Sequence, residues 1–483
     1  MTPSDCLAVL PLILIAGTSI LVMMSIVYKR IHALAAALTV GGLVVAFYSL
    51  LWVTPLVPRQ VTTLLIIDRY ALFYMGFIIA SAAAVAMLSY PYFQKHTEHR
   101  EELYLLLLVA TLGCTVLVAS SHLVSFFLGL EILSVSLYAM IAFLKDRRQS
   151  LEAGIKYLVL AAASSAFLLF GMALIYAELG TMEFSRISTA SVATSHLALV
   201  LPGIVLILAG IGFKLAVVPF HLWTPDVYEG APAPVTAFIA TVSKVAVFAL
   251  VLRFFYPSNL QQSRAVFVVF VLIAVASMVA GNLLALWQTN VKRILAYSSI
   301  AHFGYMLVGF VAGGDIAIEA VTFYLVAYTV TTLGAFGVVT VLSTSGRDAD
   351  RLDDYAGLFW RRPLLAGIFT VMLLSLAGIP ATMGFLAKFY VLTAGASTMK
   401  WSLILILVMT STIGLFYYLR ILVALYSASS DRAATAEPLV LANGMVLALL
   451  TTLLFWFGIY PAPLVDMIQT SAVPSVVEFL TLN

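Results

Sequence analysis

Charged residues are scarce in this chain, because only 10% of its 483 residues are Asp, Glu, Lys or Arg, whereas 63% are hydrophobic. No soluble domain with a polar exterior has that balance. The first apolar run follows Asp5 and has no basic segment before it, so we expect a retained helix rather than a cleaved signal peptide. The sequence therefore predicts a single all-α polytopic protein that is embedded in the lipid bilayer.

Cofactor motifs are also missing. The chain has two cysteines, Cys6 and Cys114, which form no C-x-x-C, and its seven histidines give no i, i+4 pair inside an apolar run. Iron–sulfur clusters, bis-histidine haem and H-E-x-x-H zinc sites need such spacings. Neither G-x-G-x-x-G nor a P-loop is present. We expect no cofactor and no metal in this chain, and no nucleic acid among its partners.

Apolar segments of about 20 residues, enough to cross roughly 30 Å of hydrocarbon, recur along the chain. About fourteen are predicted, at residues 8–28, 33–55, 70–91, 102–120, 122–143, 155–178, 200–220, 234–256, 265–286, 291–312, 315–343, 363–396, 401–428 and 438–460. The odd-numbered loops hold about fifteen Lys and Arg and the even-numbered loops about six. Because basic loops stay in the cytoplasm, we predict that both termini are periplasmic.

Two of these segments carry helix-breaking residues beside a lysine. The seventh holds Lys214 ahead of Pro219, and the twelfth, about 34 residues long, holds Gly378 and Pro380 ahead of Lys388. Proline removes a backbone donor and clashes with the preceding turn. In hydrocarbon, the freed polar groups must be covered by protein or by a water-filled cavity. We therefore predict that helices 7 and 12 are discontinuous.

Two broken helices that lie five segments apart predict a five-helix repeat, helices 4–8 followed by helices 9–13. Because five is odd, the second copy enters the membrane from the opposite side, which gives two inverted repeats. Within the single membrane domain 1–483, we expect N-terminal helices 1–3 in 1–100 and the first repeat in 101–256. The second repeat is expected in 265–428, and the C-terminal helix and tail in 438–483.

Buried charges are the candidate site. At about 1.5 Å per residue, Glu131, Lys214 and Lys244 fall roughly 14 to 21 Å from their helix starts, near the bilayer midplane. A charge there costs between about 2.5 and over 10 kcal/mol. The three buried lysines, Lys214, Lys244 and Lys388, therefore indicate a functional role.

Burial favours a neutral amine and a nearby carboxylate favours a charged one, so a modest rearrangement can load or release a proton. We expect Glu131 to pair with Lys214, Lys244 to be the central relay and Lys388 to be the exit group. The transported ion is expected to be H⁺, because a lysine repels Na⁺. The alternative is that the lysines only satisfy carbonyls that the helix breaks leave free.

Polar residues of the tenth segment could extend this row. His302, with Ser298, Ser299 and Tyr305, could carry a water-mediated link between Lys244 and Lys388, or it could be a satisfied core histidine.

Three further groups have mainly structural interpretations. His221, at the break of helix 7, is expected to bond backbone groups that the break leaves free. Glu152 should complement the dipole at the start of segment six, although it could also help water to reach the path. Lys292 and Arg293, beside Trp287, are expected to be interface anchors.

The run FKLAVVPFHLWTPDVYEGAPAPVTAFIATVSKVAVF, with LGLEILSVSLY before it and AGIPATMGFLAKFY after it, resembles the antiporter-like membrane subunits of proton-pumping NADH–quinone oxidoreductase, complex I. The likeness covers essentially the whole chain. It is greatest for the N branch of the bacterial enzyme, because the chain is short, lacks a long C-terminal lateral helix and has lysine in the twelfth segment. The resemblance implies a proton-relay role for residues that match the motif of the family, namely Glu131, Lys214, Lys244, His302 and Lys388.

The resemblance further implies a translocase in which NADH, FMN, iron–sulfur clusters and quinone belong to partner subunits. The membrane subunits among these partners include antiporter-like paralogues of this chain. It places the chain in the bacterial inner membrane. Multisubunit cation/proton antiporters and membrane-bound hydrogenases use the same motif and are the alternative. A non-conducting structural membrane subunit is the second alternative.

Overall fold

The structure is a computed structural model that describes residues 2–95, 100–187, 198–256, 263–428 and 439–473. Within these residues, twelve continuous helices are long and apolar enough to cross a membrane. Two further crossings are broken, because α9 (Val200–Leu215) is followed by α10 (Trp223–Gly230), and α18 (Pro363–Ala377) by α19 (Met383–Ser397). The fourteen predicted crossings and the discontinuity of helices 7 and 12 are therefore confirmed.

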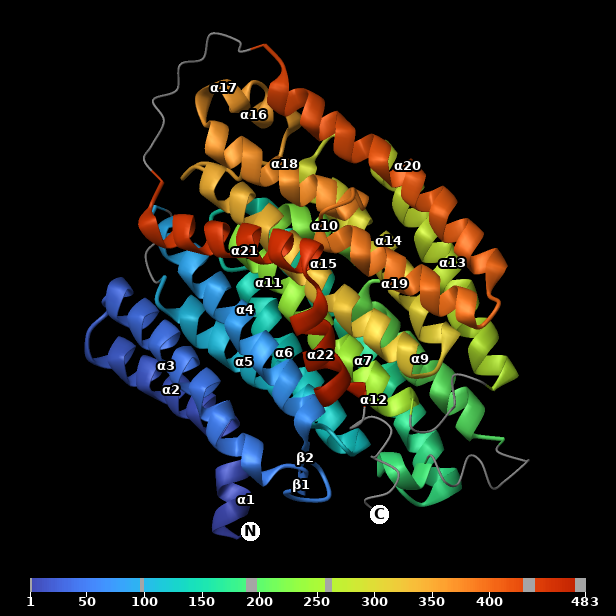
Figure 1. Cartoon of the computed structure of the whole chain (residues 1–483). Coiled ribbons are helices and arrows are strands. Elements are labelled where there is room, and N and C mark those ends of the chain that lie inside the picture. The colour runs from blue at the N-terminus through green and yellow to red at the C-terminus, as the bar shows by residue number, and fades with distance from the viewer. Residues whose placement is uncertain (1, 96–99, 188–197, 257–262, 429–438, 474–483) are drawn as a thin grey trace.

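The N-terminal part comprises α1 (Pro3–Ala8), α2 (Leu10–Tyr28), α3 (His32–Val53) and α4 (Arg69–Gln94). A short 3-10 turn, Thr54–Leu56, and two antiparallel strands, β1 (Arg59–Gln60) and β2 (Ile66–Ile67), join α3 to α4. Asp68 caps α4 by accepting a hydrogen bond from the backbone of Ala71. Figure 1 shows α2 and α3 at one side of the bundle and α20 at the other.

The two repeats follow one another. The first consists of α5 (Glu102–Ala119), α6 (Leu123–Ile141), α7 (Arg148–Leu179), the broken pair α9 and α10, and a helix formed by α11 (Ala233–Phe238), a π-helical turn (Ile239–Ser243) and α12 (Lys244–Phe255). The second consists of α13 (Arg264–Leu286), α14 (Val291–Ala312), α15 (Asp315–Leu342), the broken pair α18 and α19, and α20 (Trp401–Tyr426). The fourth crossing is broken in both repeats, as the inverted-repeat prediction required.

The remaining helices lie outside the repeats: α16 (Leu352–Tyr355), α17 (Leu358–Arg361), α21 (Leu441–Ile459) and α22 (Ala462–Ser471). Most predicted boundaries are within a few residues of those observed. Segment six is the exception, because α7 begins at Arg148, seven residues before the predicted start. Polar residues on the first turns of α7 interrupt the apolar run, and they made the helix look shorter than it is.

Three central helices form the interior of the bundle. The apolar part of the helix Ala233–Phe255 is 100% buried, that of α14 is 94% buried and that of α15 is 89% buried, against 33% for α20. Polar side chains on these three helices are therefore shielded from lipid by the rest of the chain. In such surroundings they must find their hydrogen-bond partners on one another.

Candidate proton-relay site

Lys214 lies in the last turn of α9, where the chain leaves the helix through Ala216 in a left-handed conformation (φ 61°). The side chain is 5% exposed. Its Nζ donates to Ser134 Oγ at 2.6 Å and to Tyr157 Oη at 3.4 Å. The C-terminal end of a helix carries a partial negative charge, so this position favours a cation.

Glu131, on α6, does not contact Lys214 directly. Its Oε1 accepts a hydrogen bond of 2.5 Å from Ser165 Oγ, and among the ion pairs of the described residues there is none between Glu131 and Lys214. Lys214 instead binds Ser134, which lies one turn along α6 from Glu131. The expected direct pair is therefore wrong for this structure, and a hydroxyl group occupies the position in which the carboxylate was expected.

The break of helix 7 covers its polar backbone with several side chains, and the His221 imidazole is one of them, as expected. Pro219 and His221 lie in the turn between α9 and α10. Within the described chain, the Nδ1 atom of His221 has no hydrogen-bond partner. The indole of Trp223 donates to the carbonyl of Phe213 at 2.9 Å, and Ser277 Oγ accepts from the backbone of Val218 at 2.9 Å. These two side chains add to the hydrogen bond between the His221 imidazole and the backbone of Pro219, which is the kind of role that we predicted for His221.

Lys244 begins α12 directly after the π-helical turn, and it is completely buried. Its Nζ donates to Ser299 Oγ of α14 at 2.8 Å and lies 4.8 Å from the ring centroid of Phe303. Tyr328 of α15 donates to the same Ser299 Oγ at 2.7 Å. π-Helical turns occur frequently at functional sites, and this one ends at Ser243, directly before Lys244.

His302 is hydrogen-bonded through both ring nitrogens. Its Nδ1 lies 2.8 Å from Tyr324 Oη and its Nε2 lies 3.2 Å from Tyr418 Oη. Ser298 also contacts the Tyr418 hydroxyl, and Tyr305 accepts from Asn282 Nδ2 at 2.8 Å. The three residues that the tenth segment was predicted to contribute therefore lie in one buried group of hydroxyls.

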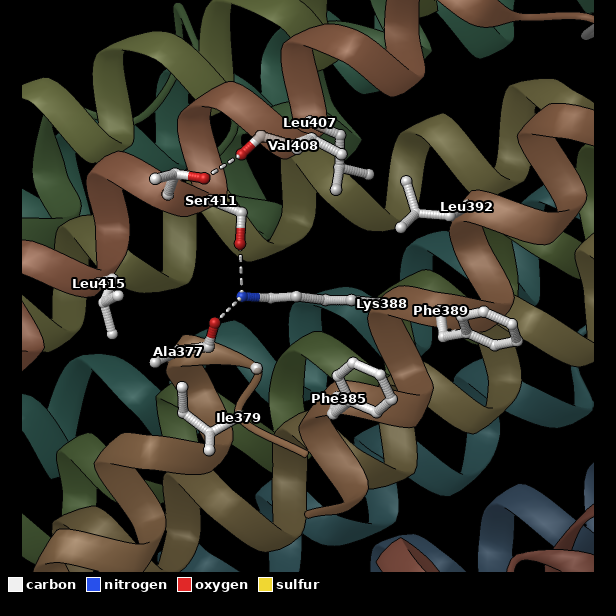
Figure 2. Close-up of a pocket in the computed structure, with 12 residues that line it drawn as sticks. Ala377, Ile379, Phe385, Lys388, Phe389, Leu392, Leu407, Val408, Ser411 and Leu415 are labelled. Atoms are coloured by element: carbon white, nitrogen blue, oxygen red, sulfur yellow. Dashed lines mark hydrogen bonds between the residues drawn. The ribbon is translucent and has the colours of Figure 1, made fainter. Parts of the chain in front are cut away.

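Lys388, on α19, reaches back to the end of α18. Its Nζ donates to the carbonyl of Leu376 at 2.9 Å. It also donates to the carbonyl of Ala377 and to Ser411 Oγ of α20, both at 2.8 Å (Figure 2). Gly378, with φ 87°, ends α18, and Pro380 lies in the turn that follows. A cavity of about 280 Å³ with mainly apolar walls borders the ammonium group.

A second, much smaller cavity lies between His302 and the two half-helices α18 and α19. It measures about 10 Å³, the space that one water needs. Its walls include His302. They also include Tyr328, which shares Ser299 with Lys244, and Leu376, whose carbonyl accepts from Lys388. These walls are almost wholly apolar, both ring nitrogens of His302 bind tyrosine hydroxyls, and the Tyr328 hydroxyl donates to Ser299. The water-mediated link between Lys244 and Lys388 therefore stays a prediction.

Glu152 lies in the second turn of α7 rather than at a helix start, and it is 56% exposed. It pairs with Lys156 at 2.8 Å, and Lys156 also pairs with Asp226 of α10 at 2.8 Å. These groups, with Glu229, line a polar cavity of about 180 Å³. The proposed role of Glu152 in water access fits this arrangement, because Tyr157, which follows Lys156 on α7, contacts Lys214.

Ser299 was named from the sequence beside His302, but not as the hydrogen-bond partner of Lys244. Three other hydroxyls of the site were missed. Tyr328, Tyr418 and Ser411 gave no signal, because buried tyrosines and serines are common in apolar helices and simply hydrogen-bond where they can.

Comparison with known proteins places this geometry in a family. Residues 120–414 match the family model of the NADH:quinone oxidoreductase/Mrp antiporter membrane proteins. Subunit N of NADH-quinone oxidoreductase from Ectopseudomonas mendocina is 49% identical over 99% of this chain and 98% of its own length.

Solved structures agree in fold. A chain of respiratory complex I from Thermus thermophilus, solved with bound aureothin, superposes with a TM-score of 0.81 at 31% identity, covering 94% of this chain and 98% of that one. A chain of the Mrp complex from Dietzia shares the fold at 20% identity, with a TM-score of 0.87 over 100% of this chain and 99% of that one. The chain belongs to the antiporter-like membrane subunits of NADH–quinone oxidoreductase, in the subunit N family.

Proposed function

We propose that this chain moves protons across the bacterial inner membrane through Lys214, Lys244 and Lys388, driven by electron transfer in partner subunits. Glu131 assists from beside the first lysine, by acting on Lys214 through space rather than by direct contact. NADH, FMN, iron–sulfur clusters and quinone are assigned to the partner subunits. The excess of basic residues in the odd-numbered loops supports a cytoplasmic position for those loops and a periplasmic one for both termini.

The main support is the hydrogen bonding of the buried ammonium groups. Lys244 has a single hydrogen-bond acceptor among the described residues, Ser299 Oγ, and no carboxylate pairs with it. A buried ammonium group with so little compensation is expensive to keep charged. Its proton is therefore easily given up, and the neighbouring hydroxyls provide acceptors in the direction of His302.

The onward route follows from the small cavity. Ser299 accepts from both Lys244 and Tyr328, and Tyr328 borders the space that also touches His302 and Leu376. Because Tyr328 donates to Ser299, its hydroxyl must first turn from Ser299 toward the cavity. Lys244 then passes a proton to Ser299 as Ser299 passes its own hydroxyl proton to Tyr328, and Tyr328 releases its proton into the cavity on the Lys388 side. The cavity of about 280 Å³ beside Lys388 gives room for water on the exit side.

The experiment replaces Lys244 with methionine in the intact complex, purified and reconstituted into proteoliposomes. We expect the complex to assemble and the number of protons moved per NADH oxidised to fall. The matched control is Lys145→Met, because Lys145 is an exposed lysine in a loop. An unchanged proton-to-electron ratio in the assembled Lys244→Met complex would refute the relay and favour a non-conducting structural subunit. Proton exchange that depends on Na⁺ or K⁺ would favour the cation/proton antiporter alternative.

A further inference from the structure

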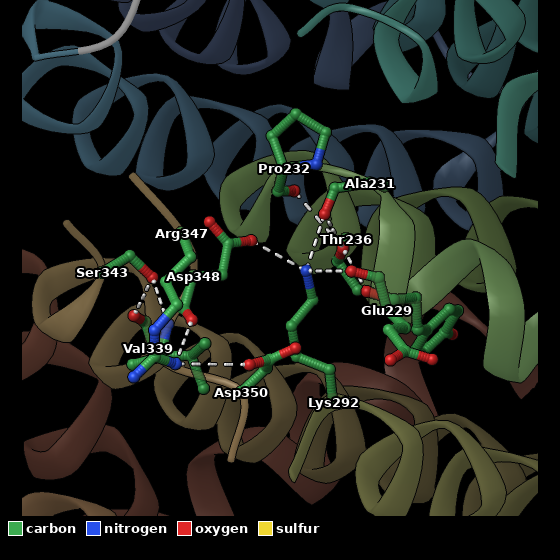
Figure 3. Close-up of polar contacts among 12 residues, drawn as sticks. Glu229, Ala231, Pro232, Thr236, Lys292, Val339, Ser343, Arg347, Asp348 and Asp350 are labelled. Carbon is green, nitrogen blue, oxygen red and sulfur yellow. Dashed lines mark hydrogen bonds and ion pairs between the residues drawn. The ribbon is translucent and has the colours of Figure 1, made fainter. Parts of the chain in front are cut away.

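Lys292, in the first turn of α14, is completely buried, contrary to the expectation of an interface anchor. Its Nζ donates to the carbonyls of Glu229 and Ala231 at 2.9 and 2.7 Å and to Asp348 Oδ2 at 2.8 Å (Figure 3). An ammonium group has three donors, so all of them are used. Lipid-facing snorkelling is thereby excluded for this side chain.

Asp348 connects Lys292 to the rest of the bundle. It lies in the loop after α15 and is 6% exposed. Its Oδ1 accepts from Tyr92 of α4 at 2.6 Å and from Arg147, which precedes α7, at 3.0 Å. One carboxylate therefore joins α4 and the first repeat to two segments of the second repeat.

The two carbonyls that Lys292 binds lie at the corner between α10 and α11. The last carbonyls of a helix have no partner within it, and an ammonium group there complements the helix dipole. Beyond this corner the chain continues through α11 and the π-helical turn directly to Lys244. The position of the corner therefore affects the position of Lys244.

Helix α14 contacts this segment at two points. Lys292 and Ser299 are seven residues apart, which is two helical turns or about 10 Å, so they lie on the same face of α14. Lys292 donates to the Ala231 carbonyl at the corner, and Ser299 Oγ accepts a hydrogen bond from Lys244 Nζ. Because a helix is stiff over two turns, the first contact fixes the separation at the second.

We propose that Lys292, held by Asp348, is a positioning residue that keeps Ser299 within hydrogen-bonding distance of Lys244. This inference rests on the proposed relay function. Lys292 itself relays no proton, because its three donors are committed to acceptors outside the relay. The pair acts by setting the distance across which Lys244 passes its proton.

The test compares two double variants in the reconstituted complex, K292M/D348N and K292Q/D348N. Both remove the charges of Lys292 and Asp348 together, so neither of these two is left buried without the other. Arg147 loses its ion pair with Asp348 equally in both variants, and its side chain is 22% exposed, so we expect the complex to assemble. The two variants differ only in that glutamine keeps a donor for the Ala231 carbonyl. We expect the proton-to-electron ratio of K292M/D348N to fall to that of Lys244→Met, and that of K292Q/D348N to stay nearer to wild type.

Controls separate this inference from the relay itself. Arg293→Met removes the neighbouring cation, whose Nη1 binds the side chains of Asp226 and Glu229 and not the corner carbonyls, and it should leave the ratio unchanged. A wild-type ratio in assembled K292M/D348N, with a reduced ratio in Lys244→Met, would overturn the positioning role and leave the relay intact. A wild-type ratio in Lys244→Met would overturn both. If K292M/D348N fails to assemble, a K292Q/D348N ratio as low as that of Lys244→Met overturns the positioning role, and a higher one supports it.

Discussion

Replacement of Gly384 by alanine is the sharpest test of the broken twelfth helix. Gly384 lies in the first turn of α19, where its backbone donates to Ser375 Oγ of α18 at 3.1 Å. A Cβ at this position would lie 2.0 Å from the carbonyl oxygen of Ser375, whereas real Cβ atoms essentially never come closer than 3.0 Å. The two half-helices must therefore separate by about 1 Å, and overpacking of this kind costs typically 1–3 kcal/mol.

The same movement acts on Lys388. Its hydrogen bonds to Leu376 and Ala377, now 2.9 and 2.8 Å, would lengthen beyond hydrogen-bonding distance if α18 moved by about 1 Å. A hydrogen bond to a charged group contributes about 1.5–3 kcal/mol, which corresponds to about a tenfold change or more in an equilibrium. We expect Gly384→Ala to assemble in reduced amount and to lose most proton translocation through this chain.

The assay measures the amount of assembled complex and its proton-to-electron ratio in proteoliposomes. Gly367→Ala is the matched control, because it is also a glycine of helix 12 but a Cβ there meets nothing within 4 Å. Equal assembly and equal proton translocation in the two variants would refute the claim that close contact of α18 and α19 holds Lys388 in place.

Three further outcomes are expected. Ser299→Ala removes the acceptor of Lys244, so proton translocation should fall about tenfold or more in vesicle assays, and an unchanged rate would contradict the relay. Asp68→Asn leaves the guanidinium of Arg253 buried without its carboxylate, which should destabilise the protein by about 3–5 kcal/mol and lower its level in membranes, whereas exposed Asp146→Asn should not. Burial raises the pKa of the Asp348 carboxyl, but the attraction of a buried lysine and hydrogen bonds outweigh this, and the pKa lies below its ordinary value. The resulting stabilisation is complete above about pH 4 and is lost only as the pH falls through the lowered pKa of the folded state. The difference in melting temperature between wild type and Asp348→Asn should therefore be constant from pH 6 to 8. A trend in that range would contradict this assignment.

The sequence predicted the crossings and the two breaks because long apolar runs and proline have strong, local physical consequences. Burial of Lys214, Lys244 and Lys388 followed from the same runs. The partners of these lysines could not be predicted in the same way. Ser299 and Ser411 come from helices that are distant in the chain, and their contacts depend on how the helices are rotated.

Two errors have a common cause. Lys292 was expected at the interface because it lies near the start of its segment beside Trp287, yet it is completely buried. Glu131 was expected to touch Lys214 because it was the one carboxylate available at that depth. In both cases depth along the helix was predicted well, whereas the direction of the side chain around the helix axis was not. That direction decides the contact, and it is set by tertiary packing.

Three of the buried lysines share one form of compensation. Lys214 sits in the last turn of α9, Lys388 binds the final carbonyls of α18, and Lys292 binds those at the end of α10. A helix terminus offers roughly half a negative charge, but unlike a carboxylate it has no basic site that can capture a proton. An ammonium group stabilised in this way can discharge without neutralising its own counter-charge. In the proposed relay, the site would then keep its attraction for the next proton, and Lys214 and Lys388 would be ready to reload after each transfer.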